Sequence, residues 1–278
     1  MTHPFLVYLR LELADARRSK WAIFATSVYV LLGAAFVWLG LRESTVLGFT
    51  GLSRVLLNVA HTVILVFPLL VLVGTHAAVV RGKTSGFCEL MLVQPVRRST
   101  WLLALLASRM VILIGPFVLL LLGGSAASAL GLGEPELLRT SLTSLSICAS
   151  LVSAYIGLGL LVSASARSAE RAIVWALAVF AMGAALHDML LITALMRTSL
   201  PPQLVFALAA LNPCEAARVG VLSSVDPELS VLGPVGFWLA NYLGQTRALA
   251  LAIGYPLLIS LLSTGAAWLK LRRADLVA

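Results

Sequence analysis

The chain of 278 residues is 60% hydrophobic and 12% charged, and its mean hydropathy is +1.00. A soluble domain carries about twice that charged fraction, so the composition excludes a soluble protein and indicates an integral membrane protein. The formal net charge of +8 does not indicate nucleic-acid binding, because the cations lie at the ends of hydrophobic stretches rather than on one patch.

The first predicted element is an amphipathic helix over residues 4–18, within an interfacial segment of residues 1–20. Its apolar side chains gather on one side and its charged side chains flank them, which is typical of a helix lying in the membrane interface. Six hydrophobic spans follow, each long enough to cross about 30 Å of hydrocarbon as a helix. They are predicted at residues 21–41, 55–80, 101–122, 142–164, 172–195 and 248–269. Pro68 is a candidate kink in the second span, and Pro116 lies inside the third.

The distribution of Lys and Arg predicts how these spans are oriented. With the N-terminus inside, the inner segments hold 13 of these cations and the outer segments hold 6. Cytoplasmic loops carry the excess of positive charge in membrane proteins. We therefore predict an all-α membrane protein with six transmembrane helices, both termini in the cytoplasm, and a single transmembrane domain over residues 1–278.

The inner loop between the second and third spans, residues 81–100, carries the most informative local pattern. Its sequence is RGKTSGFCELMLVQPVRRST, with apolar side chains at helical spacing in the middle and cations at both ends. We predict a short helix over residues 86–94 that Pro95 ends. An apolar run such as FCELMLV requires cover from water, so an inert solvated turn is the alternative that fits less well.

The outer segment, residues 196–246, is the longest non-spanning part of the chain. Its apolar pieces at residues 204–211 and 235–243 are too short to cross the membrane as helices. We expect short helices that lie on or dip into the outer interface, with Trp238 among the aromatic anchors. A model with eight spans is the alternative.

No catalytic apparatus is evident. The tripeptide Gly82-Lys83-Thr84 ends like a phosphate-binding loop, but Ala77 stands where the first glycine is needed and a membrane helix precedes it. HExxH and GxSxG motifs and paired carboxylates in the spans are also lacking. We therefore predict no catalytic residue in this chain.

Ionisable residues inside predicted spans are candidates for function. His61, His187 and Asp188 are candidates for lining a pathway, with a structural role as the alternative for each. Arg109 and His76 lie closer to span ends and are expected to be structural.

Two sets of residues bear on a possible metal site. The three cysteines, Cys88, Cys148 and Cys214, share no metal-ligand or disulfide spacing. His187, Met189, Met196 and Cys214 are soft ligands of the kind that copper(I) accepts. Methionine in an apolar span is more often packing, and no spacing here is diagnostic. No metal site is predicted.

This organisation resembles the permease of ABC-2 type transporters. The motif that carries the resemblance is Gly86 to Met91 in the inner loop, followed by Pro95 to Arg98 before the third span. Arg81 and Lys83 depart from the family pattern, because they stand where acids are common, and Leu105 stands where a Gly-Lys pair often opens the third span.

Within that family, the chain is most similar to the membrane subunits of transporters that mature nitrous oxide reductase. The residues that carry this similarity are Leu47 to Thr50, Leu211 to Pro213 with Arg218, and the apolar piece at residues 235–243. The resemblance implies a homodimer in the bacterial inner membrane, two copies of a separate cytoplasmic ATPase, and a periplasmic partner on the outer segment. It also implies a role in assembling a copper–sulfur centre, with ATP and Mg held by the ATPase and no cofactor in this chain.

The same resemblance implies two contact regions. Contacts with the ATPase are expected from Gly86, Phe87, Glu89, Leu90, Met91, Pro95, Arg97 and Arg98. Contacts with the periplasmic partner are expected from Asn212, Pro213, Arg218, Asp226 and Trp238. Because the chain has no nucleotide chemistry of its own, it must receive work through a surface that a soluble motor can grip, and movement of about 5 Å at such a loop can tilt whole helices.

Three other functions remain open from the sequence. The first is an ABC-2 exporter of a lipid, drug or peptide. The second is an ion-coupled carrier without an ATPase, which would usually hold more buried charge and an inverted repeat. The third is an intramembrane enzyme built around His187 and Asp188.

Overall fold

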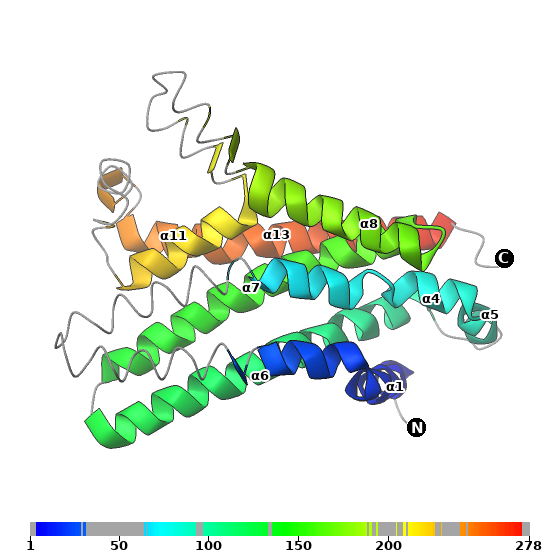
Figure 1. The fold of residues 1–278 in the computed structure, drawn as a ribbon, viewed down its shortest axis with the longest axis horizontal. Coiled ribbons are helices and arrows are strands. Elements are labelled where there is room, and N and C mark those ends of the chain that lie inside the picture. Colours follow the sequence, from blue (N-terminus) through cyan, green and yellow to red (C-terminus); the bar gives the residue numbers. More distant parts are fainter. Residues whose placement is uncertain are drawn as a thin grey trace.

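The regular elements in the described part of the chain are all helices (Figure 1). The computed structural model describes residues 4–28, 30–31, 64, 66–92, 97–132, 135–187, 189–190, 193, 204, 208–209, 211–225, 229, 240–242 and 244–273. Four helices in this part are long and apolar enough to cross a membrane, and they are Val66–Thr84, Arg98–Leu119, Leu142–Ser165 and Gly244–Arg273. They coincide with the second, third, fourth and sixth predicted spans.

The first and fifth predicted spans are described only in part. Helix α1, Pro4–Arg18, is the predicted interfacial helix. A new helical stretch begins at Lys20 and is described to residue 28 and at residues 30–31. The predicted fifth span begins as α8, Ala169–Phe180, and continues as the π-helical turn η1, Ala181–Leu186. The remainder of both spans lies outside the described residues, so the total of six and the orientation stay predictions.

Helix α7, Pro135–Ser165, forms the centre of the bundle and contacts α6, Arg98–Leu132, and α13, Gly244–Arg273. Small residues let its neighbours approach closely. A methyl group added at Gly157 would lie 2.9 Å from the carbonyl oxygen of Ser260 on α13, and one at Gly159 would overlap Thr75 of the second span. Around these contacts, the buried core includes Phe67, Trp101, Leu151, Tyr155 and Ile156.

The second span is interrupted near its end. Its helix runs from residue 66 to Thr75, turns at His76 and Ala77, and resumes as α4, Ala78–Thr84. The chain stays helical through Pro68, so the interruption lies two turns beyond the predicted kink. Ring nitrogen Nδ1 of His76 lies 2.6 Å from the Val73 carbonyl oxygen, in the turn where the helix is interrupted.

The outer segment contains a longer helix than the sequence predicts. Helix α11, Pro213–Val225, packs against α7 and α13, with Cys214, Ala217 and Val221 buried in the core. It lies at one end of the bundle (Figure 1). Helices α1 and α5, Phe87–Leu92, and the last turn of α13 lie at the other end, which we call the α5 end. This arrangement places the N-terminal helix, the predicted coupling loop and the C-terminal helix end on one side.

Candidate coupling site

A short helix stands in the predicted loop. Helix α5, Phe87–Leu92, is bounded on one side by Gly86, whose φ of +73° favours glycine. The Gly86 carbonyl oxygen accepts hydrogen bonds from the Glu89 and Leu90 amides, at 3.1 and 3.2 Å. The helix within the predicted range of residues 86–94 is therefore present through Leu92, and Pro95 lies outside the described residues.

The side chains of α5 divide into an inner and an outer set. Cys88 is fully buried, and a methyl group added at Gly82 would lie 3.4 Å from its sulfur. Leu90 is 71% exposed, and Glu89 is also exposed. These two side chains form the accessible face of α5; the Met91 side chain lies outside the described part of the chain.

Phe87 packs toward α6, and its expected contact with an ATPase stays a prediction. Its ring lies 6.1 Å from that of Trp101, centroid to centroid, and the side chain is half-buried against the core. Trp101 itself is 1% exposed. The Phe87 ring therefore joins α5 to α6, while Leu90 points away from the bundle.

The first anchor of the loop is Lys83. Its ammonium group donates a hydrogen bond of 2.9 Å to the carbonyl oxygen of Ala164, in the last turn of α7. Helix ends leave carbonyl oxygens without intrahelical partners and carry a partial negative charge. A cation suits this position, and this accounts for the lysine that departs from the acidic family pattern.

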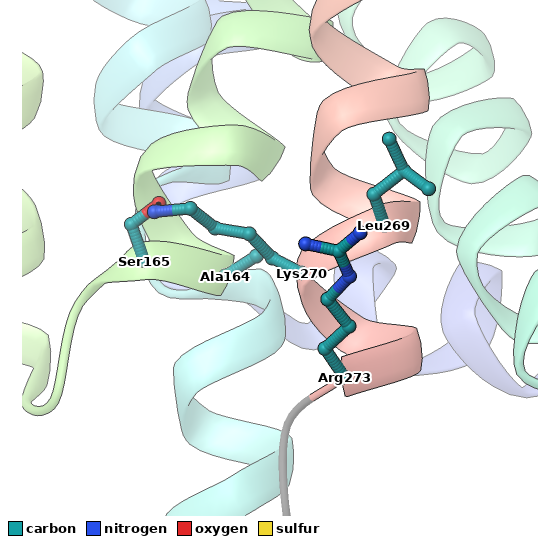
Figure 2. A pocket seen from close by; sticks show the side chains of 5 residues that line it. All are labelled: Ala164, Ser165, Leu269, Lys270 and Arg273. Carbon is teal, nitrogen blue, oxygen red and sulfur yellow. Dashed lines mark hydrogen bonds between the residues drawn. The ribbon is translucent and has the colours of Figure 1, made fainter.

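The second anchor lies where the loop enters α6. The Arg98 guanidinium donates to the Leu271 carbonyl oxygen at 2.6 Å and to that of Arg272 at 3.4 Å, both in the last turn of α13. Lys270 of α13 donates to the Ser165 hydroxyl at 2.8 Å. Figure 2 shows Lys270 crossing from α13 to the end of α7 beside a pocket of about 310 Å³. The loop is thus tied to α7 at one end and to α13 at the other.

Helix α4 is also held at its beginning. Ala77, at its N-cap position, makes no side-chain hydrogen bond. The Ser163 hydroxyl of α7 instead accepts from the backbone amides of Val79 and Val80, at 2.9 and 3.1 Å. The free backbone amides at the start of a helix are normally bonded by the side chain of the helix's own N-cap residue. Here a serine on a neighbouring helix supplies the acceptor oxygen. Together with Lys83, this contact binds both ends of α4 to α7.

Charge around the loop is mostly positive. Of the loop cations, Arg81 and Arg97 are exposed, while Lys83 and Arg98 are partly buried. Burial raises the pKa of the Cys88 thiol, and the nearby Lys83 and Arg98 cations oppose this only in part. The site therefore presents a basic rim around the apolar tip at Leu90.

Away from the loop, Asn212 caps the beginning of α11, next to the middle of α7. Its side-chain oxygen accepts from the Cys214 amide at 3.0 Å, and its side-chain nitrogen donates to the Gly183 carbonyl oxygen in η1. Pro213 follows at the first helical position, which proline favours. Asn212 is 3% exposed. Asn212 is therefore a buried helix cap, and its expected contact with a periplasmic partner stays a prediction.

Other residues expected at the partner surface have different settings. Arg218 forms an ion pair of 2.6 Å with Glu215 one turn earlier in α11, and its side chain is 25% exposed. Asp226 and Trp238 lie outside the described residues. The Tyr255 hydroxyl donates to the Leu211 carbonyl oxygen at 2.6 Å, which fixes the turn before α11 to α13.

Of the three pathway candidates, the structure describes His187. His187 Nε2 lies 3.0 Å from the Leu208 carbonyl oxygen, so this nitrogen carries the proton there. His61 and Asp188 lie outside the described residues. Cys214 contacts the Tyr155 hydroxyl at 3.1 Å. Across the described ranges, no three His, Cys, Asp or Glu side chains are grouped closely enough to hold a metal ion.

Several residues that position the loop carry little signal in the sequence. Ser163 acts on a helix more than eighty residues earlier, and nothing in its local sequence indicates that role. Gly82 belongs to the false phosphate motif, yet in the structure it makes room for Trp101 and Cys88. The one available signal is the glycine before the loop helix together with the tryptophan that opens the third span.

Comparisons with known proteins agree with the geometry. The sequence matches the family model described as ABC-2 family transporter protein over residues 6–275. It is similar to the probable ABC transporter permease protein NosY of Pseudomonas aeruginosa, with 30% identity over 264 residues that cover 88% of this chain and 94% of that protein. The protein of the same name from Stutzerimonas stutzeri is 26% identical over 232 residues, covering 81% and 83% of the two chains. The predicted family resemblance is confirmed.

Proposed function

This chain belongs to the family of ABC-2 transporter proteins, and from that premise we propose that α5 couples it to a separate cytoplasmic ATPase. In this proposal the chain is a multi-pass membrane subunit with no catalysis of its own. ATP and Mg are held by the ATPase, two copies of which bind a dimer of this chain. The orientation that places α5 in the cytoplasm of a bacterial inner membrane is part of the proposal.

The observation that carries the proposal is the double attachment of the α5 loop. Lys83 ties the loop to α7, and Arg98 ties it to α13. A push on the exposed face of α5 would act on two long helices at once, because charge-assisted hydrogen bonds resist separation more than neutral ones do. Packed helices move as rigid elements, so displacement of α5 would reach the far end of the bundle.

The far end would receive this motion through α11. This helix packs against the same α7 and α13 that hold the loop. Asn212 links it further to η1, a π-helical turn of the kind often found at functional positions. We propose that motion of α11 and its flanking residues acts on a periplasmic protein, with Arg218 and Asp226 at the contact surface.

The process served is proposed to be maturation of the copper centre of nitrous oxide reductase. Similarity to proteins named NosY supports it, as do the sequence motifs at residues 47–50 and 211–213. In this proposal copper is cargo of the complex, and no metal site is assigned to this chain. The competing function in the same family is export of a lipid, drug or peptide.

The coupling proposal is tested by placing a charge on the tip of α5. Leu90→Arg changes a side chain that is 71% exposed, and Leu211→Arg changes one that is 63% exposed in the turn before α11, away from α5. The complex is purified from native membranes with each variant. Loss of the co-purified ATPase with Leu90→Arg and its retention with Leu211→Arg are expected.

Two results would contradict the proposal. Purification of the unaltered chain without an ATPase would remove the coupling role and favour an ion-coupled carrier. Normal ATPase binding and stimulation in Leu90→Arg would place the contact elsewhere.

The proposed role in maturation of the copper centre is tested by deleting the gene and measuring the copper-dependent absorbance of nitrous oxide reductase. An enzyme with a full copper centre in the deletion strain would favour export of another substrate.

A further inference from the structure

A cavity of about 920 Å³ lies behind α5, between α1, the first helical stretch, the second span and α6. It reaches from Glu12 on α1 to Phe87 on α5. Its volume is within the range of small-molecule sites. It borders the coupling site at Gly82, Phe87 and Trp101, but the contacts that anchor the loop do not account for the space itself.

The polar atoms left without partners in this cavity are all hydrogen-bond donors. The indole nitrogens of Trp21 and Trp101 and the Nε atom of Arg109 are buried and make no hydrogen bond within the described residues. All three side chains line the cavity. Trp and charged Arg side chains can only donate, and an unsatisfied buried donor costs about 1–3 kcal/mol. A bound group rich in acceptor oxygens would satisfy them.

Among the three unpaired donors, the Trp101 indole nitrogen is the strongest evidence for a bound acceptor, because the residue is only 1% exposed. Burial raises the pKa of the neighbouring Glu12 carboxyl, and the Arg109 cation and the Trp101 indole oppose this only in part. The indole nitrogen makes no hydrogen bond within the described residues. The ring is held between Gly82 and Phe87, so its orientation is fixed by packing. The N–H group is therefore set in place before any ligand arrives.

The charge of the cavity has the sign that such a ligand needs. Four cations and two carboxylates line it, and they are Arg18, Lys20, Arg81 and Arg109 against Glu12 and Asp15. Arg109 and Glu12 form a long ion pair of 4.0 Å, so their charges balance each other. The remaining cations outnumber the remaining carboxylate, so an anion is favoured over a cation.

The position of the cavity fits a ligand at the membrane surface. Arg81 lies three residues before the end of the second span, Val66–Thr84, and Trp101 lies three residues after the start of Arg98–Leu119. At 1.5 Å per residue, both lie about 5 Å from a span end. Lipid phosphates lie just outside the hydrocarbon at this depth, and basic pockets between spans can bind anionic headgroups.

We propose that this cavity binds a phosphate group, supplied by an anionic phospholipid of the leaflet at the α5 end. The phosphate oxygens accept from the indole nitrogens of Trp21 and Trp101, and Arg18 and Arg81 balance the charge. Such a lipid bridges α1 to the loop that carries α5. The proposal does not depend on an ATPase partner, because the permease alone contains every residue invoked.

The test measures thermal stabilisation of the purified protein by three probes. They are short-chain phosphatidylglycerol, short-chain phosphatidylcholine and inorganic phosphate. Phosphatidylglycerol is expected to raise the melting temperature and phosphatidylcholine is not. Stabilisation by inorganic phosphate that is lost in the cavity variants would uphold the phosphate site with a soluble source. A rise that is equal for both lipids would overturn the proposal.

Matched variants connect the effect to the cavity. Arg18→Gln with Arg81→Gln removes two exposed cations that line it, whereas Arg10→Gln with Arg167→Gln removes two exposed cations that do not. The first pair is expected to weaken half-saturation by phosphatidylglycerol roughly fivefold, since each exposed cation that balances the phosphate charge contributes a modest amount. An equal loss in the second pair would mean that surface charge alone attracts the lipid, and would overturn the site.

Trp101→Phe keeps an aromatic ring near Phe87 but removes the N–H group together with the five-membered ring of the indole, so its thermal stability without lipid is measured beside its lipid binding. Weaker binding is expected from this variant as well. Native mass spectrometry of the unaltered protein supplies an independent readout, with retained anionic phospholipid as the expected result. Unaltered binding in Trp101→Phe would overturn the proposal, because the indole nitrogen would not be a donor to the phosphate. A protein that retains no anionic phospholipid and gains no stability from phosphate would show that the cavity holds water alone.

Discussion

The ammonium group of Lys83 and the carbonyl oxygen of Ala164 form a hydrogen bond of 2.9 Å that joins the end of α4 to the end of α7. Lys83→Met keeps most of the apolar stem and removes the donor. We expect the free energy of unfolding to fall by about 1–2 kcal/mol, the contribution of a hydrogen bond to a charged group at a partly exposed site. Thermal unfolding in detergent measures it.

The control for Lys83 is Arg167→Met, which removes a cation from an exposed position of the turn between α7 and α8. It is expected to change stability little. Lys83→Arg retains a donor and should fall between the two. Equal effects of Lys83→Met and Arg167→Met would show that net charge, rather than the bond to Ala164, is responsible.

Close packing of α7 against α13 predicts a second result. In Gly157→Ala the new methyl group would lie 2.9 Å from the Ser260 carbonyl oxygen and 3.1 Å from the Thr264 hydroxyl. The two helices must separate, and a cost of about 1–3 kcal/mol is typical of overpacking. Gly265→Ala is the matched control, because nothing lies within 4 Å of its added carbon. Thermal unfolding should separate the two, with Gly265→Ala neutral or slightly stabilising; the reverse order would refute this packing.

Asn212 combines a helix cap with a link to η1, and two substitutions separate these roles. Asn212→Ala removes both the bond to the Cys214 amide and the bond to Gly183, and we expect a loss of about 2 kcal/mol in stability. Asn212→Ser keeps a capping oxygen and should lose about half of that. Alkylation of Cys214, which is 4% exposed, reports opening of this region. A serine variant as unstable as the alanine variant would mean that the cap contributes nothing.

The thiol of Cys88 should react slowly and with a shifted pH dependence. Alkylation requires the thiolate, and burial raises the pKa of this group. A raised pKa lowers the thiolate fraction at any pH below it, so the rate should rise at higher pH than for an exposed cysteine. Peptide mapping by mass spectrometry follows Cys88 alone among the three cysteines.

Displacing α5 should release Cys88. Gly82→Val adds atoms where a single methyl group would already lie 3.1 Å from the Trp101 ring and 3.4 Å from the Cys88 sulfur. Faster alkylation of Cys88 is expected in this variant, with Gly115→Val as the control because its added carbon meets nothing within 4 Å. A Cys88 that is equally protected in both would contradict the packing of α5 against Gly82.

Much of the fold could be read from the sequence because membrane spans follow from local composition. Four predicted spans coincide with long apolar helices, and the interfacial helix appears as α1, Pro4–Arg18. A stretch of about 20 apolar residues must form a helix in lipid, since its backbone groups have no water to bond. The break at His76 and the helix α11 could not be predicted in this way, because both depend on contacts with other helices.

For the candidate site, the chain by itself determined that a short apolar helix stands between cations in the loop after the second span. Hydrophobic periodicity is enough for that, since it acts within a few residues; the end of the helix at Pro95 stays a prediction. The sequence could not predict which groups the cations of the loop bind, or whether Phe87 faces the bundle or the solvent. The tertiary structure decided that Lys83 and Arg98 cap the ends of α7 and α13 and that Phe87 faces Trp101. Lys83 and Ala164 are separated by 81 positions in the sequence, and Arg98 and Leu271 by 173. Only the packed bundle brings each pair within hydrogen-bond distance.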